Sequence, residues 1–234
     1  MNRIELLREL AGRPTFNSAH FRSVTGEDRA YAAVHLWRLR EAGHVAALRR
    51  DRFTVQSSPL SVASHVVWPS YISMWSALRH WELTEQVPRA VWVVTTRRVE
   101  DIEFRGTPIQ FIRSDPRRFF GYTKVELDGW QGFMAEPEKA LLDGLIFRRV
   151  PVAEIAAALS RSPRRWSSRK LASWALRLRS AALCKRVGYL MESVGADPEP
   201  RLLRQVDATW TPLDWSAPAE GRRDTRWRLV VNTR

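Results

Sequence analysis

The sequence has little of what a secreted, membrane-bound or metal-binding protein needs. Its 234 residues include one cysteine, Cys184, which excludes an internal disulfide and a cysteine-rich metal site. No apolar run reaches the roughly 18–20 residues of a membrane-spanning helix. Residues 1–14 are charged and amphipathic, and they lack the apolar stretch of a signal peptide. We therefore expect a cytoplasmic protein with no membrane contact.

Catalytic and cofactor motifs are also missing. The five histidines are scattered, and none has the spacing of a zinc site. The chain has neither the Gly-x-Ser-x-Gly turn of a serine hydrolase nor a glycine-rich phosphate loop. The sequence therefore predicts no cofactor, no metal ion and no catalytic residues, and we expect a protein that is not an enzyme.

Positive charge is abundant, and it is unevenly distributed. The net charge is +13 and the isoelectric point is near 11.1. Residues 1–57 carry a net +4, residues 58–150 only +1, and residues 151–234 carry +8. A polyanion such as nucleic acid is the partner that this balance favours. The alternative is an arginine-rich composition that reflects a GC-rich genome.

The first quarter of the chain predicts three helices and a basic hairpin. Apolar residues recur at helical spacing in the first and third of these helices, and two short apolar runs flank a polar turn after them. Three helices followed by a basic hairpin are typical of a winged helix-turn-helix, a DNA-binding module. The predicted bounds are 2–10, 18–24 and 27–42 for the helices and 44–55 for the hairpin, which turns at Arg50-Asp51.

The third helix is the predicted recognition helix. Its buried face is expected at Ala32, Leu36 and Leu39. Thr25 and Asp28 resemble a capping box at its start, and Gly43 follows its end, where a glycine commonly terminates a helix.

Arginine and aromatic side chains then lie on the outward half of that helix. Arginine pairs well with guanine in the major groove, so Arg29 and Arg38 are the candidates for base contact. Phosphate contacts are expected from the hairpin tip. The alternatives are a solvated basic face and a protein-binding module. The predicted DNA-binding residues are Arg29, Tyr31, His35, Arg38, Arg49, Arg50 and Arg52.

The rest of the chain predicts a second domain, residues 58–234, with strands first and helices afterwards. A buried strand is expected at 90–96, and hairpins are expected to turn at Gly106-Thr107 and at Asp128-Gly129. From residue 151 the pattern is mostly helical, with a final strand at 226–232. The predicted fold class is α+β, an amino-terminal winged helix followed by a mixed α/β domain with a helical carboxyl-terminal half.

Five segments of this second domain resemble the AbiEi family of antitoxins. They are "YISMWSALRHWELTEQVPRAVWVVTT" (71–96), "FFGY" (119–122), "AEPEKALLD" (135–143), "KRVGYLMESVG" (185–195) and the closing "TPLDW…RWRLVVN". The family commonly has His-Gly-Leu before its Thr, whereas this chain has Trp81 and Glu82 before Leu83-Thr84.

The resemblance implies an antitoxin of a type IV toxin–antitoxin system. Such a protein binds inverted repeats in its own promoter through the winged helix and counteracts a nucleotidyltransferase toxin of the AbiEii kind, without needing a stable complex. The resemblance also implies a set of candidate antitoxin-domain motif residues. They are Tyr71, Ser73, Gln86, Glu138, Lys139, Arg186 and Glu192.

Three other interpretations remain open. The second domain could sense a ligand in a regulator that has no toxin. The 136–143 cluster of carboxylates and a lysine could act in catalysis, although helix capping and ion pairing along a helix explain it more simply.

Tryptophans among the basic residues of the carboxyl-terminal part could stack on DNA or RNA bases, although they more often fill a core or cover arginine stems. These are Trp166, Trp174, Trp210, Trp215 and Trp227.

Overall fold

The computed structural model describes residues 1–233, and its contacts divide the chain into two compact units. Unit 1 comprises Met1–Ile72, Arg89–Ser114 and Lys124–Met134. Unit 2 comprises Ser73–Pro88, Asp115–Thr123 and the chain from Ala135 onward. The chain thus passes between the units several times. The expected boundary at residues 57 and 58 lies within unit 1, and independent folding of residues 1–57 stays a prediction.

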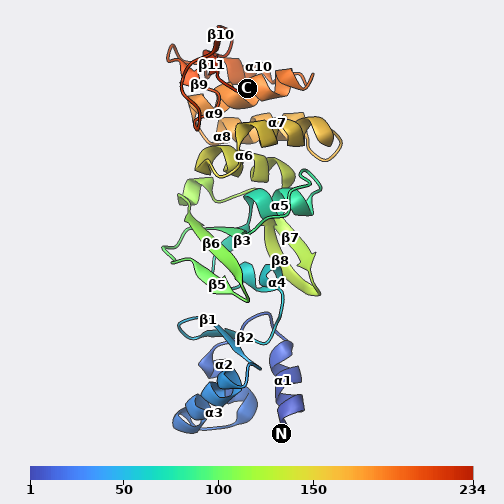
Figure 1. Ribbon diagram of the computed structural model, residues 1–234, viewed down its shortest axis with the longest axis vertical. Coiled ribbons are helices and arrows are strands. Elements are labelled where there is room, and N and C mark those ends of the chain that lie inside the picture. Colours follow the sequence, from blue (N-terminus) through green and yellow to red (C-terminus); the bar gives the residue numbers. More distant parts are fainter. Residues whose placement is uncertain (234) are drawn as a thin grey trace. The chain divides into compact units, whose positions relative to one another are not determined.

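The fold is a mixed α+β structure, as the sequence predicts at this level. Three amino-terminal helices with a small hairpin come first, a six-stranded mixed sheet follows, and the carboxyl-terminal region is mostly helical (Figure 1). In the part of the chain that the structure describes, every helix is too short or too polar to span a bilayer.

The amino-terminal helices enclose a core of their own. The chain between α1 and α2 runs alongside the hairpin, where Phe16 and Phe53 exchange two backbone hydrogen bonds of 2.8 Å. The core lies between the three helices and the hairpin and contains Leu6, Leu10, Phe16, Phe21, Ala32, Leu36, Leu39 and Val45. The elements are α1 (Arg3–Ala11), α2 (Ser18–Thr25), α3 (Arg29–Glu41), β1 (Ala46–Arg49) and β2 (Arg52–Thr54).

The six-stranded sheet has the order β5-β6-β4-β3-β8-β7. Strand β4 pairs in parallel with β6 and antiparallel with β3. Two tight hairpins turn at residue pairs with positive φ, Arg105-Gly106 and Asp128-Gly129, which suits the twist of the flanking strands. The elements are α4 (Pro59–Ala63), β3 (Ser70–Ile72), β4 (Val91–Thr95), β5 (Ile102–Phe104), β6 (Thr107–Arg113), β7 (Tyr122–Leu127) and β8 (Trp130–Ala135).

Two local predictions need correction here. The pattern of residues 60–67 also indicates a helix, but the helix ends at Ala63. Beyond it the Ser70 hydroxyl donates to the carbonyls of Ser64 and Val67, where the chain enters β3. The first hairpin turns one residue earlier than expected, at Arg105-Gly106 rather than at Gly106-Thr107, because Thr107 already pairs with Phe104.

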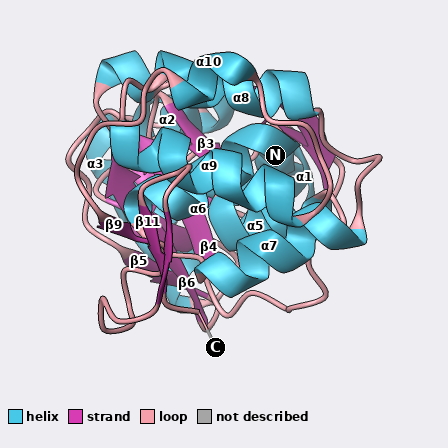
Figure 2. Cartoon of the chain, turned by 90° about the horizontal axis from the view of Figure 1, so that it is seen from above, coloured by secondary structure: helices cyan, strands magenta, loops and turns pink. Residues whose placement is uncertain are grey.

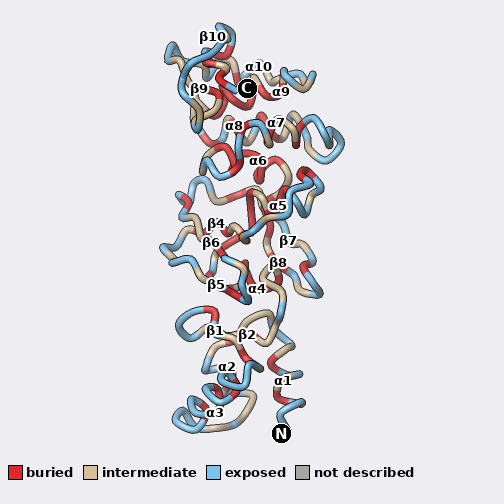
Figure 3. Tube along the Cα trace, viewed as in Figure 1, coloured by how far each residue is buried: buried red, intermediate tan, exposed pale blue. Residues whose placement is uncertain are grey.

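Unit 2 is built around α6, which packs against α5, α7 and α8. Figure 2 shows the helices of this region in cyan, and Figure 3 draws the trace of α6 mostly in red because most of its residues are buried. The helices are α5 (Met74–His80), η1 (Pro116–Arg118), α6 (Pro137–Phe147), α7 (Val152–Arg161), α8 (Ser168–Arg177), α9 (Ala181–Ser193) and α10 (Pro200–Leu203).

A small three-stranded sheet covers α9. Its order is β10-β11-β9, with β9 (Thr211–Pro212), β10 (Arg222–Asp224) and β11 (Leu229–Val231). Of these strands, the sequence predicts only the last. Trp227 anchors the sheet: its ring is fully buried over Gly188, where an added Cβ would lie 2.1 Å from the ring. The indole nitrogen donates a 2.7 Å hydrogen bond to Glu192. A glycine on α9 is therefore needed for the sheet to dock.

Candidate nucleic-acid interface

Helix α3 is held in place at both ends. Asp28 caps its start by accepting hydrogen bonds from the backbone of Ala30 and Tyr31 at 2.8 and 2.9 Å. Gly43 follows the helix with a φ of +74°, as expected for a glycine terminus. The predicted capping box is wrong, because Thr25 belongs to α2 and its hydroxyl donates to the Phe21 carbonyl.

The buried face of α3 is the one that its apolar spacing predicts. Ala32, Leu36 and Leu39 are each at most 6% exposed. Opposite them, Val34 is 46% and Trp37 is 55% exposed. The outermost strip of the helix is therefore apolar rather than basic.

The predicted base-contacting arginines lie on opposite flanks of α3. A surface hollow of about 360 Å³ on one flank includes Arg38, Tyr31 and also Arg3 from α1. A hollow of about 290 Å³ on the other flank includes Arg29 and also Arg22 from α2. Sequence reasoning missed Arg3 and Arg22 because they belong to other helices, and only the packing of α1 and α2 on α3 brings them there.

Two contacts restrict the orientation of the His35 ring. Its Nδ1 lies 2.8 Å from a carboxylate oxygen of Glu27, and its ring meets that of Phe21 edge-on at 5.4 Å. Glu27 and Phe21 hold the ring, so the contribution of His35 to an interface depends on its remaining exposed edge.

The hairpin tip is basic, and it is tied to α2. Arg49 and Arg50 are exposed, whereas Arg52 is half-buried. Between them, Asp51 accepts a 2.8 Å hydrogen bond from the backbone of Ser18, at the start of α2. The hydrogen bonds from Ser18 hold the pKa of Asp51 below its ordinary value. This contact fixes the tip, and it occupies a helix N-terminal N–H group that could otherwise bind a phosphate.

The carboxylate–lysine cluster of α6 joins helices to one another. Lys139 forms an ion pair with Asp143, and Asp143 accepts a 2.7 Å hydrogen bond from Ser73 at the start of α5. All three residues are 0% exposed. Glu138 accepts a 2.7 Å hydrogen bond from the backbone of Ser167, ahead of α8. The ion pairing along a helix that the sequence suggests is confirmed for Lys139 and Asp143. These contacts explain the cluster as a tie between α5, α6 and α8.

Glu136 does not pair with Lys139. Its carboxylate forms an ion pair with Lys170 of α8 instead. The sequence could not reveal this partner, because Lys170 is brought near only by the packing of α8 on α6.

The remaining residues of the family-like motifs lie apart. Tyr71 is fully buried in β3, and Gln86 is exposed beyond Thr84, whose hydroxyl accepts from its backbone at 3.1 Å. Arg186 and Glu192 lie on α9, where Glu192 binds Trp227. The structure does not gather these residues into one site.

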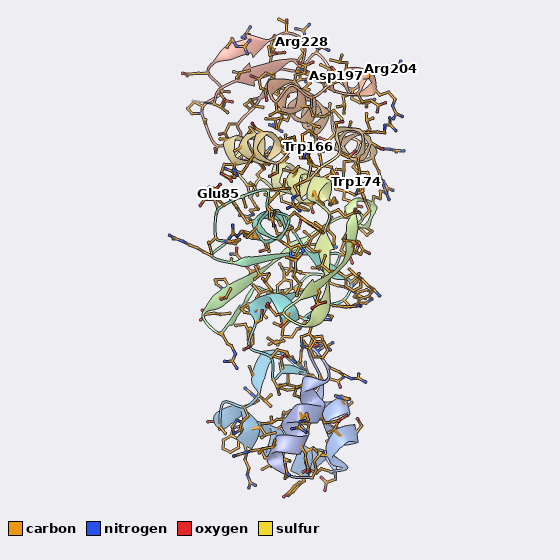
Figure 4. The ribbon with its side chains drawn as sticks, turned by 90° about the vertical axis from the view of Figure 1, so that its right-hand side faces the viewer. Glu85, Trp166, Trp174, Asp197, Arg204 and Arg228 are labelled. Atoms are coloured by element: carbon orange, nitrogen blue, oxygen red, sulfur yellow. The ribbon has the colours of Figure 1, made fainter. Side chains whose placement is uncertain are left out.

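The tryptophans of the carboxyl-terminal part pack within unit 2. Trp227 is fully buried, and the indole nitrogen of Trp166 donates to the Leu159 carbonyl at 3.1 Å. Trp174, labelled with Trp166 in Figure 4, lies half-buried with the Lys170 ammonium 4.7 Å from its ring centre. Trp210 and Trp215 lie beside arginine side chains. These contacts favour core filling and arginine covering over base stacking.

Among residues 1–233, no group of three or more His, Cys, Asp or Glu side chains is arranged to hold a metal ion. Comparison with models of known protein families finds no match, and no curated protein matches this chain. The resemblance to AbiEi antitoxins therefore rests on the quoted segments alone.

Proposed function

We propose that residues 1–57 act as a winged helix-turn-helix that binds double-stranded DNA. The observation that carries the proposal is the order of elements in this part: a helix, an extended segment paired with β2, two further helices and a basic hairpin. In such modules the last helix enters the major groove and the hairpin contacts the backbone. Exposed arginines on α3 and on the hairpin tip supply the charge that phosphates attract.

The exposure pattern of α3 suggests how it contacts the groove. Val34 and Trp37 form an apolar strip at its centre, which suits the methyl groups of thymine. Arg29 and Arg38 flank that strip and reach outward toward guanine edges or phosphates. Arg50 at the hairpin tip contacts phosphate only. The DNA sequence that the protein prefers is therefore expected to be rich in A·T pairs at its centre.

The test starts by selecting preferred sequences from random duplexes with the full-length protein. Arg38→Ala is then expected to lose about 1–3 kcal/mol at the selected site and little elsewhere. Arg50→Ala is expected to weaken all duplexes alike and to reduce the slope of log K against log salt by about 0.9. Arg98→Ala, which removes an exposed arginine from a loop of unit 1, is the matched control.

Two outcomes would contradict this assignment. The first is an Arg50→Ala protein that selects a different sequence, because a phosphate contact carries no sequence information. The second is an Arg98→Ala protein that weakens binding as much as Arg38→Ala does, because the affinity would then reflect net charge alone.

The proposal extends to the role of an antitoxin that represses its own operon in the cytoplasm. Its support is the ordered series of AbiEi-like segments between residues 71 and 232. The partners would be promoter inverted repeats and a nucleotidyltransferase toxin of the AbiEii kind. Contact with the RNA on which such a toxin acts is a third proposed interaction. No catalytic step by this chain is needed for that role.

Co-expression with a nucleotidyltransferase toxin of the AbiEii kind, encoded beside the gene for this chain, tests the antitoxin role. The full chain is expected to restore growth when the toxin is induced. The Arg38→Ala/Arg50→Ala double variant is expected to lose promoter repression and to keep the rescue, because its substitutions leave unit 2 intact. Continued growth arrest with the wild-type chain would refute the antitoxin role and leave DNA binding standing.

A further inference from the structure

Unit 2 contains two adjoining surface hollows beside the start of α9. The smaller has a volume of about 150 Å³, and its walls include Arg118, Arg148 and Arg186. The larger has a volume of about 550 Å³, and its walls include Arg117 and, from the end of α8, Arg177 with Arg179 just beyond it. Arg118 and Leu178 line both hollows, so the two lie next to each other.

Positive charge in these hollows greatly exceeds negative charge. Six arginines line them, against one carboxylate, that of Asp115. None of the six arginines forms a salt bridge with a described residue, although other arginines of unit 2 do. Like charges gathered without counter-charges repel one another. An anion that entered the hollows would relieve that repulsion.

Arg186 is the most constrained of the six. It is 6% exposed, and its Nε and Nη2 donate to the carbonyls of Leu213 and Pro212 at 3.0 and 2.8 Å. Its Nη1 donates to no described residue. Burial lowers the pKa of Arg186, the charge of Arg148 lowers it further, and Asp214 opposes the change. Two carbonyls thus position a buried guanidinium that lines the smaller hollow and has one nitrogen with no described acceptor.

The start of α9 adds backbone donors to the same place. Ser180 caps this 13-residue helix by accepting from the backbone of Leu183 at 3.3 Å. Ser180, Ala182 and Leu183 all line the smaller hollow. The first N–H groups of a helix have no partners within it, and its dipole favours an anion there.

We propose that these hollows form a binding site for an oligophosphate group. The terminal phosphate occupies the smaller hollow, where Arg118, Arg148 and Arg186 and the start of α9 surround it. The following phosphates lie along Arg117, Arg177 and Arg179 in the larger hollow. Planar guanidinium groups match phosphate oxygens in pairs. A recess of about 150 Å³ admits a chain end more readily than a phosphodiester flanked by sugars on both sides.

The oligophosphate could belong to a free nucleoside triphosphate or to the 5′-triphosphate end of an RNA. Both present the same chemistry to the arginines. The site differs from the proposed DNA interface in unit 1, so the two proposals can fail independently.

Calorimetric titration of the full chain with inorganic tripolyphosphate at low salt tests the site. Wild-type protein is expected to bind it, and Arg118→Ala is expected to weaken binding about tenfold or more, since a hydrogen bond to a charged group is lost. Arg148→Ala is expected to do the same. Arg204→Ala removes an exposed arginine elsewhere in unit 2 (Figure 4), and its affinity is expected to equal that of the wild type.

Further arms identify the source of the phosphates. Adenosine triphosphate is compared with adenosine, and a short RNA with a 5′-triphosphate is compared with the same RNA bearing a 5′-hydroxyl. Tighter binding of the phosphorylated member of either pair supports the site and identifies which molecule supplies the phosphates. No binding of tripolyphosphate by the wild type overturns the proposal, and so does equal weakening by Arg118→Ala and Arg204→Ala. Thermal unfolding of each variant establishes that it folds.

Discussion

The buried ion pair of α6 allows a quantitative prediction. Lys139 and Asp143 are 0% exposed and pair one helical turn apart, and Ser73 donates to the same carboxylate. Asp143→Asn keeps the shape of the side chain and removes the charge that pairs with the buried Lys139 ammonium. Breaking such a pair typically costs about 3–5 kcal/mol. An exposed pair is worth about 0–1 kcal/mol.

The matched comparison is the exposed pair of Arg165 and Glu82, whose side chains are 54% and 69% exposed. Thermal unfolding followed by tryptophan fluorescence is expected to show a midpoint about 6–20 °C lower for Asp143→Asn, since 1 kcal/mol corresponds to about 2–4 °C at this size. Arg165→Ala is expected to shift it by less than about 4 °C. Replacing both buried partners, as Lys139→Met/Asp143→Leu, is expected to recover most of the loss.

An unfolding midpoint that falls no further in Asp143→Asn than in Arg165→Ala would contradict this prediction. Such a result would mean that water reaches the ammonium or that another group neutralises it. The prediction would equally fail if the double replacement were less stable than Asp143→Asn alone, because the penalty would then come from lost packing rather than from an unpaired charge.

Two further predictions concern α9. Gly188→Ala places a methyl group against the Trp227 ring and is expected to lower the free energy of unfolding by about 1–3 kcal/mol. Proteolysis between residues 211 and 233 is expected to become faster. Adding Trp227→Leu to the Gly188→Ala chain is expected to restore part of the stability. Burial raises the pKa of the Cys184 thiol from 9.0 to about 11, so the folded chain keeps a proton that the unfolded chain releases, and stability is expected to fall as pH rises through this interval. At about pH 8, alkylation of Cys184 is expected to follow the rate of unfolding, and modification at the rate of a free thiol in the folded protein would contradict its burial.

Local patterns were sufficient to predict most helices and hairpins. The buried stripe of α3, the Arg50-Asp51 turn and the glycine after α3 all depend on residues near one another in sequence, and the structure confirms them. The same holds for the mostly helical pattern from residue 151. Binary patterning and turn residues determine such elements, because both act over a few residues.

Predictions that required a choice between nearby partners were less successful. Thr25 and Asp28 both suit the start of a helix, and only the end of α2 at Thr25 leaves Asp28 as the cap of α3. Glu136 has Lys139 three residues away, yet it pairs with Lys170, because Lys139 is already buried against Asp143. Sequence spacing cannot rank such competitors.

By itself, then, the sequence determined the α+β class, the positions of most elements and the surplus of positive charge. Tertiary structure decided where that charge lies. Arg118, Arg148 and Arg186 come from η1, the end of α6 and α9, and they line one hollow only because those elements pack together. The physical reason is range: helix and turn preferences act along the chain, whereas a site that binds a ligand is assembled by contacts between residues far apart in it.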